Sequence, residues 1–253
     1  MLRLLLLLFT GLAAGTVGAL LGLGGGIVLV PVLTLGFGVQ ARLAVGTSLV
    51  GVIATSAGVG TVSTEGGRAD VPLALRLEIA STAGAMAGGL VGGIMSPRAL
   101  SILFAIVIFA TAVYTVIKSR HQTDEALATR DYTPKRWILG YAIASVAGML
   151  SGLLGIGGGF VKVPTMYAIM GIPLGVATAT SNFMVGITAA ASLFVYLVRG
   201  DIRPVLTAIT ASGVFLGAIG GAFLKTRISV VLLRWALVIL MMVVGVQILW
   251  KGF

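Results

Sequence analysis

The sequence predicts an all-α polytopic membrane protein made of two homologous four-span repeats, each containing a glycine-broken or re-entrant helix. Three observations predict this fold class. The chain of 253 residues is 58 % hydrophobic and only 9 % charged. Apolar segments long enough to cross a bilayer recur along it. The decamer GLGGGIVLVP at 22–31 returns as GIGGGFVKVP at 155–164.

The composition excludes several classes of protein. A soluble domain carries about 25 % charged residues, so 9 % cannot cover a water-facing surface. The chain has no cysteine, which excludes a disulfide framework and a thiolate metal site. Its one histidine, His121, has no partner for a metal. The net charge of +10 sits mainly at the ends of apolar segments, so we expect no nucleic-acid partner.

Eight apolar segments approach the roughly 20 residues that a membrane span needs. They lie at 2–21, 43–63, 72–95, 99–118, 136–154, 175–198, 204–224 and 229–250. The N-terminal segment resembles a secretory signal, but residues 11–31 have a counterpart at 144–164, so we expect it to be retained. Short apolar pieces follow the two decamers, at 27–37 and 160–171. About 11 helical residues reach half-way across a bilayer, which predicts half-helices or re-entrant segments.

The internal repeat extends beyond the decamers at the same offset, which takes position 22 to position 155. AVGTSL at 44–49 corresponds to ATATSN at 177–182, and GAMAGGL at 84–90 corresponds to GAIGGAF at 217–223. We therefore predict a first repeat at 1–118, a polar linker at 119–135 and a second repeat at 136–253. The basic linker is expected in the cytoplasm, with both termini on the same side. With four spans per half, the two repeats are parallel. If the broken segment of each half counts as an extra crossing, the repeats are inverted, and the sequence leaves both topologies open.

The two decamers should interrupt their helices. The triplets Gly24–Gly26 and Gly157–Gly159 each cost about 1 kcal/mol per residue in a helix, and Pro31 and Pro164 follow. Unwound backbone at membrane depth must be buried in protein or line a cavity. The free N–H groups at the start of the next half-helix favour an anion there. The alternative is that these glycines only permit close helix packing. A dinucleotide fingerprint fails, because its last glycine is missing.

Polar side chains near the second motif are further candidates for the site. Thr47 and Ser48 correspond to Thr180 and Ser181, and Asn182 replaces Leu49. Hydroxyls in membrane helices often bond only to the preceding turn, but a buried amide needs several partners.

Two ionisable residues fall within predicted spans. Lys162 replaces Leu29 of the first repeat and would add a cation beside the glycine turn if it points inward; snorkelling to an interface is the alternative. Glu78 lies near Arg76 and near the start of its helix, so an interfacial position is expected. With no pair of intramembrane carboxylates, a proton relay is disfavoured.

The duplicated G-[LI]-GGG-x-V-x-V-P motif, with a later [GA]-T-S, resembles the TauE/SafE family of sulfite and organosulfonate exporters. The resemblance covers nearly the whole chain. It implies an inner-membrane transporter of sulfur-containing oxyanions such as sulfite, thiosulfate or an organosulfonate. It also implies that the two glycine triplets mark the substrate-facing turns. The candidate substrate-binding residues are Gly24, Gly25, Gly26, Thr47, Ser48, Gly157, Gly158, Gly159, Lys162, Thr180, Ser181 and Asn182.

The function predicted is a secondary transporter, and an exporter in particular, that binds its anion between the repeats. We expect a small anionic substrate and the lipid bilayer as partners, no nucleic acid, no cofactor and no metal, with a homodimer left open. The alternatives are a carrier of a cation or a neutral solute, a membrane assembly factor and a channel. An enzyme is disfavoured, because no span carries a cluster of His, Asp or Glu.

Overall fold

The computed structural model describes residues 2–22, 24–62, 69–119 and 132–224, with a few further positions between 238 and 247. Within these ranges the regular elements are helices and there is no strand, which confirms the all-helical class. Most of the predicted span at 229–250, His121 and most of the predicted linker at 119–135 lie outside the described residues. Six of the described helices are long and apolar enough to cross a membrane.

The helices follow one another in the same order in both halves of the chain. The first half contains α1 (Leu2–Leu21), α2 (Gly26–Pro31), the π-helix η1 (Val32–Gly36), α3 (Ala41–Val62), α4 (Val71–Ile94) and α5 (Pro97–Ser119). The second half contains α6 (Trp137–Leu154), α7 (Gly159–Pro164), the π-helix η3 (Thr165–Ile169), α8 (Leu174–Val198) and α9 (Pro204–Leu224). For the seven predicted spans between residues 2 and 224, the boundaries agree with these helices to within about two residues.

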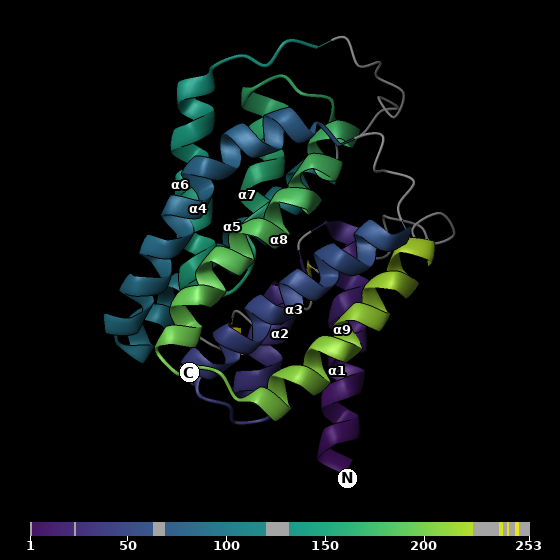
Figure 1. Cartoon of the computed structure of the whole chain (residues 1–253), viewed down its shortest axis with the longest axis vertical. Helices are drawn as coiled ribbons and strands as arrows, with labels where there is room; N and C mark the ends of the chain where they lie inside the picture. The colour runs from purple at the N-terminus through teal and green to yellow at the C-terminus, as the bar shows by residue number, and fades with distance from the viewer. Residues whose placement is uncertain are drawn as a thin grey trace.

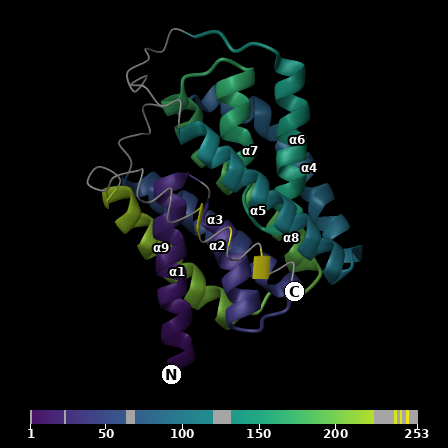
Figure 2. The ribbon, with the colours of Figure 1, turned by 180° about the vertical axis from the view of Figure 1, so that it is seen from behind.

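Most of these helices gather into two lobes, and each lobe combines helices from both halves of the sequence (Figures 1 and 2). The first lobe contains α1, α2, η1, α3 and α9, because α1 and α3 both pack extensively against α9. The second lobe contains α4, α6, α7, η3 and α8, because α4 packs extensively against α6 and α8. Contacts between α3 and α8 join the lobes. In the described fold, α4 of the first half therefore packs with helices of the second half, and α9 of the second half packs with helices of the first half.

Glycines let the helices of each lobe approach backbone to backbone. A Cβ built on Gly15 of α1 would lie 2.1 Å from the carbonyl oxygen of Val214, and one on Gly217 of α9 would lie 2.0 Å from that of Leu12. In the second lobe, a Cβ on Gly148 of α6 would lie 1.9 Å from the carbonyl oxygen of Ser81. In lipid, the hydrophobic effect does not drive helices together. Small residues let the backbones approach closely, so van der Waals packing stabilises these contacts instead.

This close approach of backbones predicts how much stability is lost when a glycine at the contact is replaced by alanine. Gly148→Ala should destabilise the protein by about 3 kcal/mol, because a backbone carbonyl cannot move aside as a side chain can. Gly220→Ala is the matched control, since Gly220 is also helical and its Cβ would meet no atom within 4 Å. Thermal unfolding in detergent measures both variants. Equal melting temperatures would show that the α4–α6 contact is looser than described.

The short helices run back along the long helices that precede them. Arg3, at the start of α1, donates from Nη2 to the carbonyl oxygen of Phe37, at the end of η1, over 3.1 Å. In the second half, the N–H of Lys135 donates to the carbonyl oxygen of Met170 over 3.0 Å. Each short segment thus ends beside the start of its long helix. Figure 1 shows the N-terminal ends of α1 and α6 at opposite ends of the molecule.

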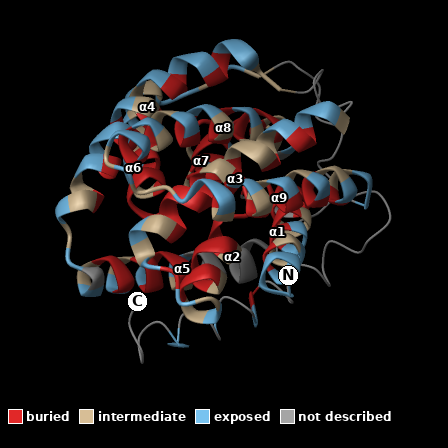
Figure 3. Ribbon diagram, turned by 60° about the horizontal axis from the view of Figure 1, so that its bottom comes forward, coloured by how far each residue is buried: buried red, intermediate tan, exposed pale blue. Residues whose placement is uncertain are grey.

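The distribution of burial fits a helix bundle in lipid. Buried residues gather where the helices face one another, and exposed residues cover the outer faces (Figure 3). Large apolar side chains occupy many outward positions. Examples are Ile79, Ile94 and Ile138, which are 76 %, 86 % and 87 % exposed. Outer faces of this kind suit contact with acyl chains rather than with water.

Candidate functional site: the crossed glycine turns and a buried ion pair

Backbone geometry at the two decamers depends on glycine. In the first turn, Gly22, Gly24 and Gly25 have φ values of 70°, 76° and 74°, and α2 begins at Gly26. In the second turn, Gly155, Gly157 and Gly158 have φ values of 69°, 88° and 73°, and α7 begins at Gly159. Residues with a Cβ rarely adopt this left-handed conformation, so the sequence of each turn and its conformation agree.

The two turns cross in contact with each other. A Cβ on Gly26 would lie 2.1 Å from the carbonyl oxygen of Gly155 and 2.9 Å from Ser48 Oγ. A Cβ on Gly159 would lie 2.8 Å from the carbonyl oxygen of Gly22 and 3.4 Å from Ser181 Oγ. Each contact in the first set corresponds, at the offset of the internal repeat, to a contact in the second. The crossing is therefore reciprocal, and backbone from both halves forms it.

Two valines pack over the crossing. A Cβ on Gly24 would lie 3.0 Å from Val52 and 3.1 Å from Val185. One on Gly157 would lie 2.7 Å from Val185 and 2.9 Å from Val52. Both valines are buried, and they too occupy equivalent positions of the two repeats. Neither glycine can be replaced without displacing a side chain that both turns share.

Polar atoms at the crossing are only partly paired. Ser48 Oγ donates to the carbonyl oxygen of Gly155 over 2.7 Å. Among the described residues, its counterpart Ser181 Oγ is buried without a hydrogen-bond partner, and so is Asn182 Nδ2. Ser151 Oγ, whose Cβ lies beside Gly158, is also unpaired. Buried polar atoms without partners are uncommon, because each costs about 1–3 kcal/mol.

Two predicted site residues lie away from the crossing. Thr47 Oγ1 is 3.1 Å from Thr207 Oγ1 and ties α3 to α9. Thr180 Oγ1 accepts from the N–H of Asp70, whose carboxylate also caps α4 by accepting from the N–H of Leu73. These threonines hold helices together, whereas Ser48 and Ser181, one residue further along, face the crossing. The match between the two Thr-Ser pairs in the sequence could not predict which residue of each pair faces the crossing.

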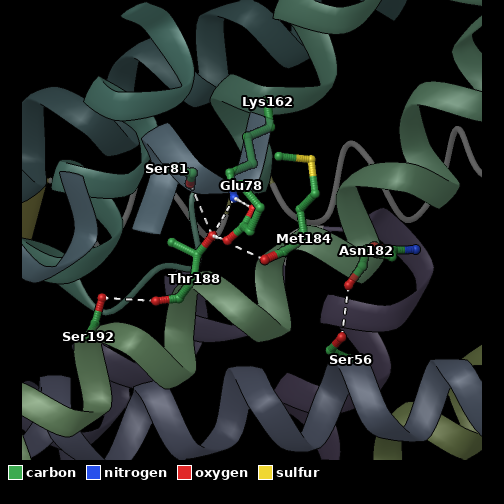
Figure 4. A network of polar contacts seen from close by, with 8 residues as sticks. All are labelled: Ser56, Glu78, Ser81, Lys162, Asn182, Met184, Thr188 and Ser192. Atoms are coloured by element: carbon green, nitrogen blue, oxygen red, sulfur yellow. Dashed lines mark hydrogen bonds and ion pairs between the residues drawn. The ribbon is translucent and has the colours of Figure 1, made fainter. Parts of the chain in front are cut away.

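Lys162 points inward and forms an ion pair with Glu78 that sequence reasoning missed. Lys162 Nζ lies 3.1 Å from Glu78 Oε2, and the two side chains are 1 % and 5 % exposed. Lys162 also donates to Thr188 Oγ1, which in turn donates to Glu78 Oε1 or to the carbonyl oxygen of Met184. Ser81 Oγ lies 3.1 Å from the same Thr188 hydroxyl (Figure 4).

The expectation that Glu78 is interfacial is therefore wrong. Glu78 lies two turns into α4, on the face that packs against α6 and α8. Arg76 points in another direction, is exposed, and lies over the ring of Trp137 at the start of α6, 5.6 Å from the ring centroid. Residues two apart on a helix do not share a face, so Arg76 says nothing about the position of Glu78. The stripe of small residues Ala74, Ser81 and Ala85 at helical spacing was the signal that this face is packed.

Long helices with apolar outer faces and polar groups held between them define an integral membrane protein. Comparison with known proteins identifies the class as membrane transporters. The family model "Sulfite exporter TauE/SafE" matches residues 7–248, so the chain belongs to the TauE/SafE family, as its motifs predicted. No solved structure matches the chain.

Two named relatives share this description. The chain is 28 % identical over 267 residues to "Probable membrane transporter protein YunE" of Bacillus subtilis, covering 98 % of this chain and 97 % of the relative. It is 31 % identical over 206 residues to "Probable membrane transporter protein MJ0441" of Methanocaldococcus jannaschii, covering 78 % of this chain and 73 % of the relative. Both names describe transporters, and neither specifies a substrate.

Proposed function

We propose that this protein is a secondary transporter of a small sulfur-containing oxyanion, such as sulfite, thiosulfate or an organosulfonate, bound where the two glycine turns cross. The observation that carries the proposal is the crossing itself. It brings unwound backbone from both halves together with Ser181 and Asn182, because Ser181 Oγ lies beside Gly159 and Asn182 Oδ1 lies beside Gly22. Ser181 Oγ and Asn182 Nδ2 are buried donors with no hydrogen-bond partner among the described residues. Donors of this kind can replace part of the hydration shell that an oxyanion loses.

We further propose that the two halves are inverted repeats. In the first half α1, the returning α2–η1 segment, α3, α4 and α5 make five passages, an odd number, so α6 begins from the face opposite to α1. Parallel packing of α1 with α9 and of α4 with α6 agrees with a twofold axis in the membrane plane. The basic linker is then cytoplasmic and the start of α1 lies on the other side, unlike the shared face first expected.

Alternating access would move the two lobes against each other. In transporters with inverted repeats, the binding site lies near the bilayer midplane, where broken helices from the two repeats meet. Here the lobes meet at α3 and α8, which carry Val52 and Val185 over the crossed turns. Rocking at this contact would open the crossing to one side and then the other. The closely packed crossing described here suits a state with neither side open.

The membrane potential supports outward transport as the direction. In an inner membrane that is negative inside, the potential favours exit of an anion by about 2.3 kcal/mol per charge for each 100 mV. A dianion such as thiosulfate would gain about twice as much. We therefore propose export as the direction when no opposing gradient is imposed.

A cation or neutral solute is the second candidate, and the structure gives it one specific observation. The carbonyl oxygens of Gly22 and Gly155 also point into the crossing, each against a glycine of the other turn. Carbonyl oxygens coordinate Na⁺ or an amine rather than an oxyanion. The free hydroxyl and amide donors favour the anion. The comparison of melting temperatures with different ligands, described next, distinguishes the anion from the cation or neutral solute.

Ligand binding should stabilise the purified protein. Thiosulfate or sulfite at about 100 times its Kd should add about 2.7 kcal/mol, visible as a higher melting temperature, while sodium in a matched chloride salt should not. Asn182→Leu, which installs the first repeat's residue, should weaken anion binding by about 10- to 100-fold. Ser212→Ala is the control, because Ser212 is exposed and bonds only within its own helix. Stabilisation by sodium or amines alone would favour the second candidate.

A further inference from the structure

The Glu78–Lys162 pair occurs in one lobe only. The repeat places Leu29, Ala211 and Val214 at the positions equivalent to Lys162, Glu78 and Ser81. Leu29 and Val214 are fully buried and pack together with Ala14. The same arrangement of helices is therefore built once around an ion pair and once around apolar side chains. The architecture does not need the charges.

The shared threonine shows what the charges change. Thr55 of the first lobe lies where its Oγ1 can donate to the carbonyl oxygen of Gly24 or of Gly51, over 3.2 Å or 3.0 Å. Thr188 is its counterpart, and its Oγ1 keeps the equivalent contact with the carbonyl oxygen of Met184, over 3.0 Å. In place of the turn carbonyl, however, it contacts Glu78, Lys162 and Ser81. In the first lobe the threonine supports the glycine turn directly. In the second lobe it is part of the charged cluster.

The charged cluster lies one helical turn from the crossing. The N–H of Lys162 donates to the carbonyl oxygen of Gly158 over 3.1 Å, so its backbone belongs to the first turn of α7. Among the described residues, Lys162 is the charged group in contact with Glu78; α8 contributes Thr188, and α4 itself contributes Ser81. From α6, Ser145 and Met149 lie against α4 and carry no charge. Lys162 thus has one anionic partner, and it is a titratable one.

We propose that the anion site extends from the crossing to this cluster, and that an anion and a proton bind there together: the anion takes the place of the Glu78 carboxylate at Lys162, and Glu78 takes up a proton from water. This inference rests on the proposed function and deepens it, because it makes anion transport proton-linked. Charge balance is the reason. The empty pair is neutral, and an anion with its charge on Lys162 beside a protonated Glu78 keeps the cluster neutral for a monoanion.

An anion that bound without the proton would leave two negative groups around one ammonium inside the protein. Such an excess charge in a low-dielectric interior costs several kcal/mol, which protonation of Glu78 removes. By reciprocity, the proton raises the affinity for the anion as much as the anion raises the affinity for the proton. A dianion that leaves with one proton still carries one negative charge outward, so the membrane potential still favours its exit.

The experiment uses the full chain in liposomes that contain a pH-sensitive dye, with thiosulfate as the probe because its charge stays constant between pH 6 and 8. A thiosulfate gradient should drive protons in the same direction as the anion in the wild-type protein. Thiosulfate binding to the protein in detergent should weaken by up to about tenfold per pH unit as the pH rises. Glu78→Gln should remove the proton movement that accompanies thiosulfate and make the Kd for thiosulfate independent of pH.

The double variant Glu78→Ala with Lys162→Leu is the second arm, since it copies the apolar cluster of the first lobe. It should fold and keep a cooperative melting transition but lose at least tenfold in thiosulfate affinity. Thiosulfate flux without proton movement in the wild-type protein would overturn the proton link and leave the transport function standing. Unchanged affinity in the double variant would likewise overturn the role of the pair. Absence of flux for thiosulfate, sulfite and methanesulfonate alike would overturn both proposals.

Discussion

Gly26→Ala should abolish transport and lower stability more than any other single methyl group at the crossed turns. Its Cβ would lie 2.1 Å from the backbone oxygen of Gly155 and 2.9 Å from Ser48 Oγ, the hydroxyl that bonds the same oxygen. Relief requires the two turns to separate, which also disturbs the packing of Val52 and Val185 over them. We expect a loss of about 3 kcal/mol or more and no measurable thiosulfate flux in liposomes.

The symmetry of the crossing provides a graded comparison for this variant. Gly159→Ala is the counterpart, and its Cβ would lie 2.8 Å from the carbonyl oxygen of Gly22, so it should cost less. Gly60→Ala is the control, because Gly60 is helical, exposed and has no atom within 4 Å of an added Cβ. Thermal melting and flux should therefore rank the three variants in this order. Wild-type flux in Gly26→Ala would show that the crossing is not where transport takes place.

Lys162→Leu alone should be far more damaging than the same substitution combined with Glu78→Ala. The single variant leaves a carboxylate buried with no cation, which costs about 3–5 kcal/mol unless the carboxylate is protonated. The double variant removes both charges and restores the apolar composition that the first lobe already has at Leu29 and Ala211. We expect the second substitution to recover most of the stability that the first one removes.

A double-mutant cycle on melting free energies measures this coupling directly. The two single variants and the double variant should give a coupling energy of about 2 kcal/mol or more at neutral pH. The penalty of Lys162→Leu should shrink at low pH, because protonation neutralises the stranded carboxylate. Additive effects would show that Glu78 and Lys162 do not interact as the structure places them.

Hydrophobic patterning was sufficient to predict the described helices, but not the packing between them. Hydrophobic segment lengths predicted α3 at 43–63, and the helix spans Ala41–Val62. The duplicated glycines marked the turns, because a left-handed backbone needs residues without a Cβ. A repeat, however, shows which segments are equivalent and not which ones touch. Nothing in the spacing of the two copies says that α9 packs on α1, or α4 on α6.

The missed ion pair has a similar physical cause. Lys162 and Glu78 are 84 residues apart and lie on helices from different halves, so no local pattern connects them. The nearby Arg76 suggested an interfacial position for Glu78, but more than half a turn of helix separates the directions of their side chains. Thr47 and Thr180 show the converse case. They adjoin Ser48 and Ser181 in the sequence, and rotation by one residue points them toward other helices.

The exchange of helices between the two halves has a consequence for how the chain is made. During synthesis α1 leaves the ribosome long before α9, whose carbonyls meet its glycine face. Until α9 enters, Gly11 and Gly15 lack the helix that packs against them, and the first lobe is unfinished. The second lobe is complete once α8 has entered, because its borrowed helix α4 is already in place. The second lobe can therefore be completed before the first, and the earliest helix, which packs on α2 and α3 as well, is the one that waits for the last described helix.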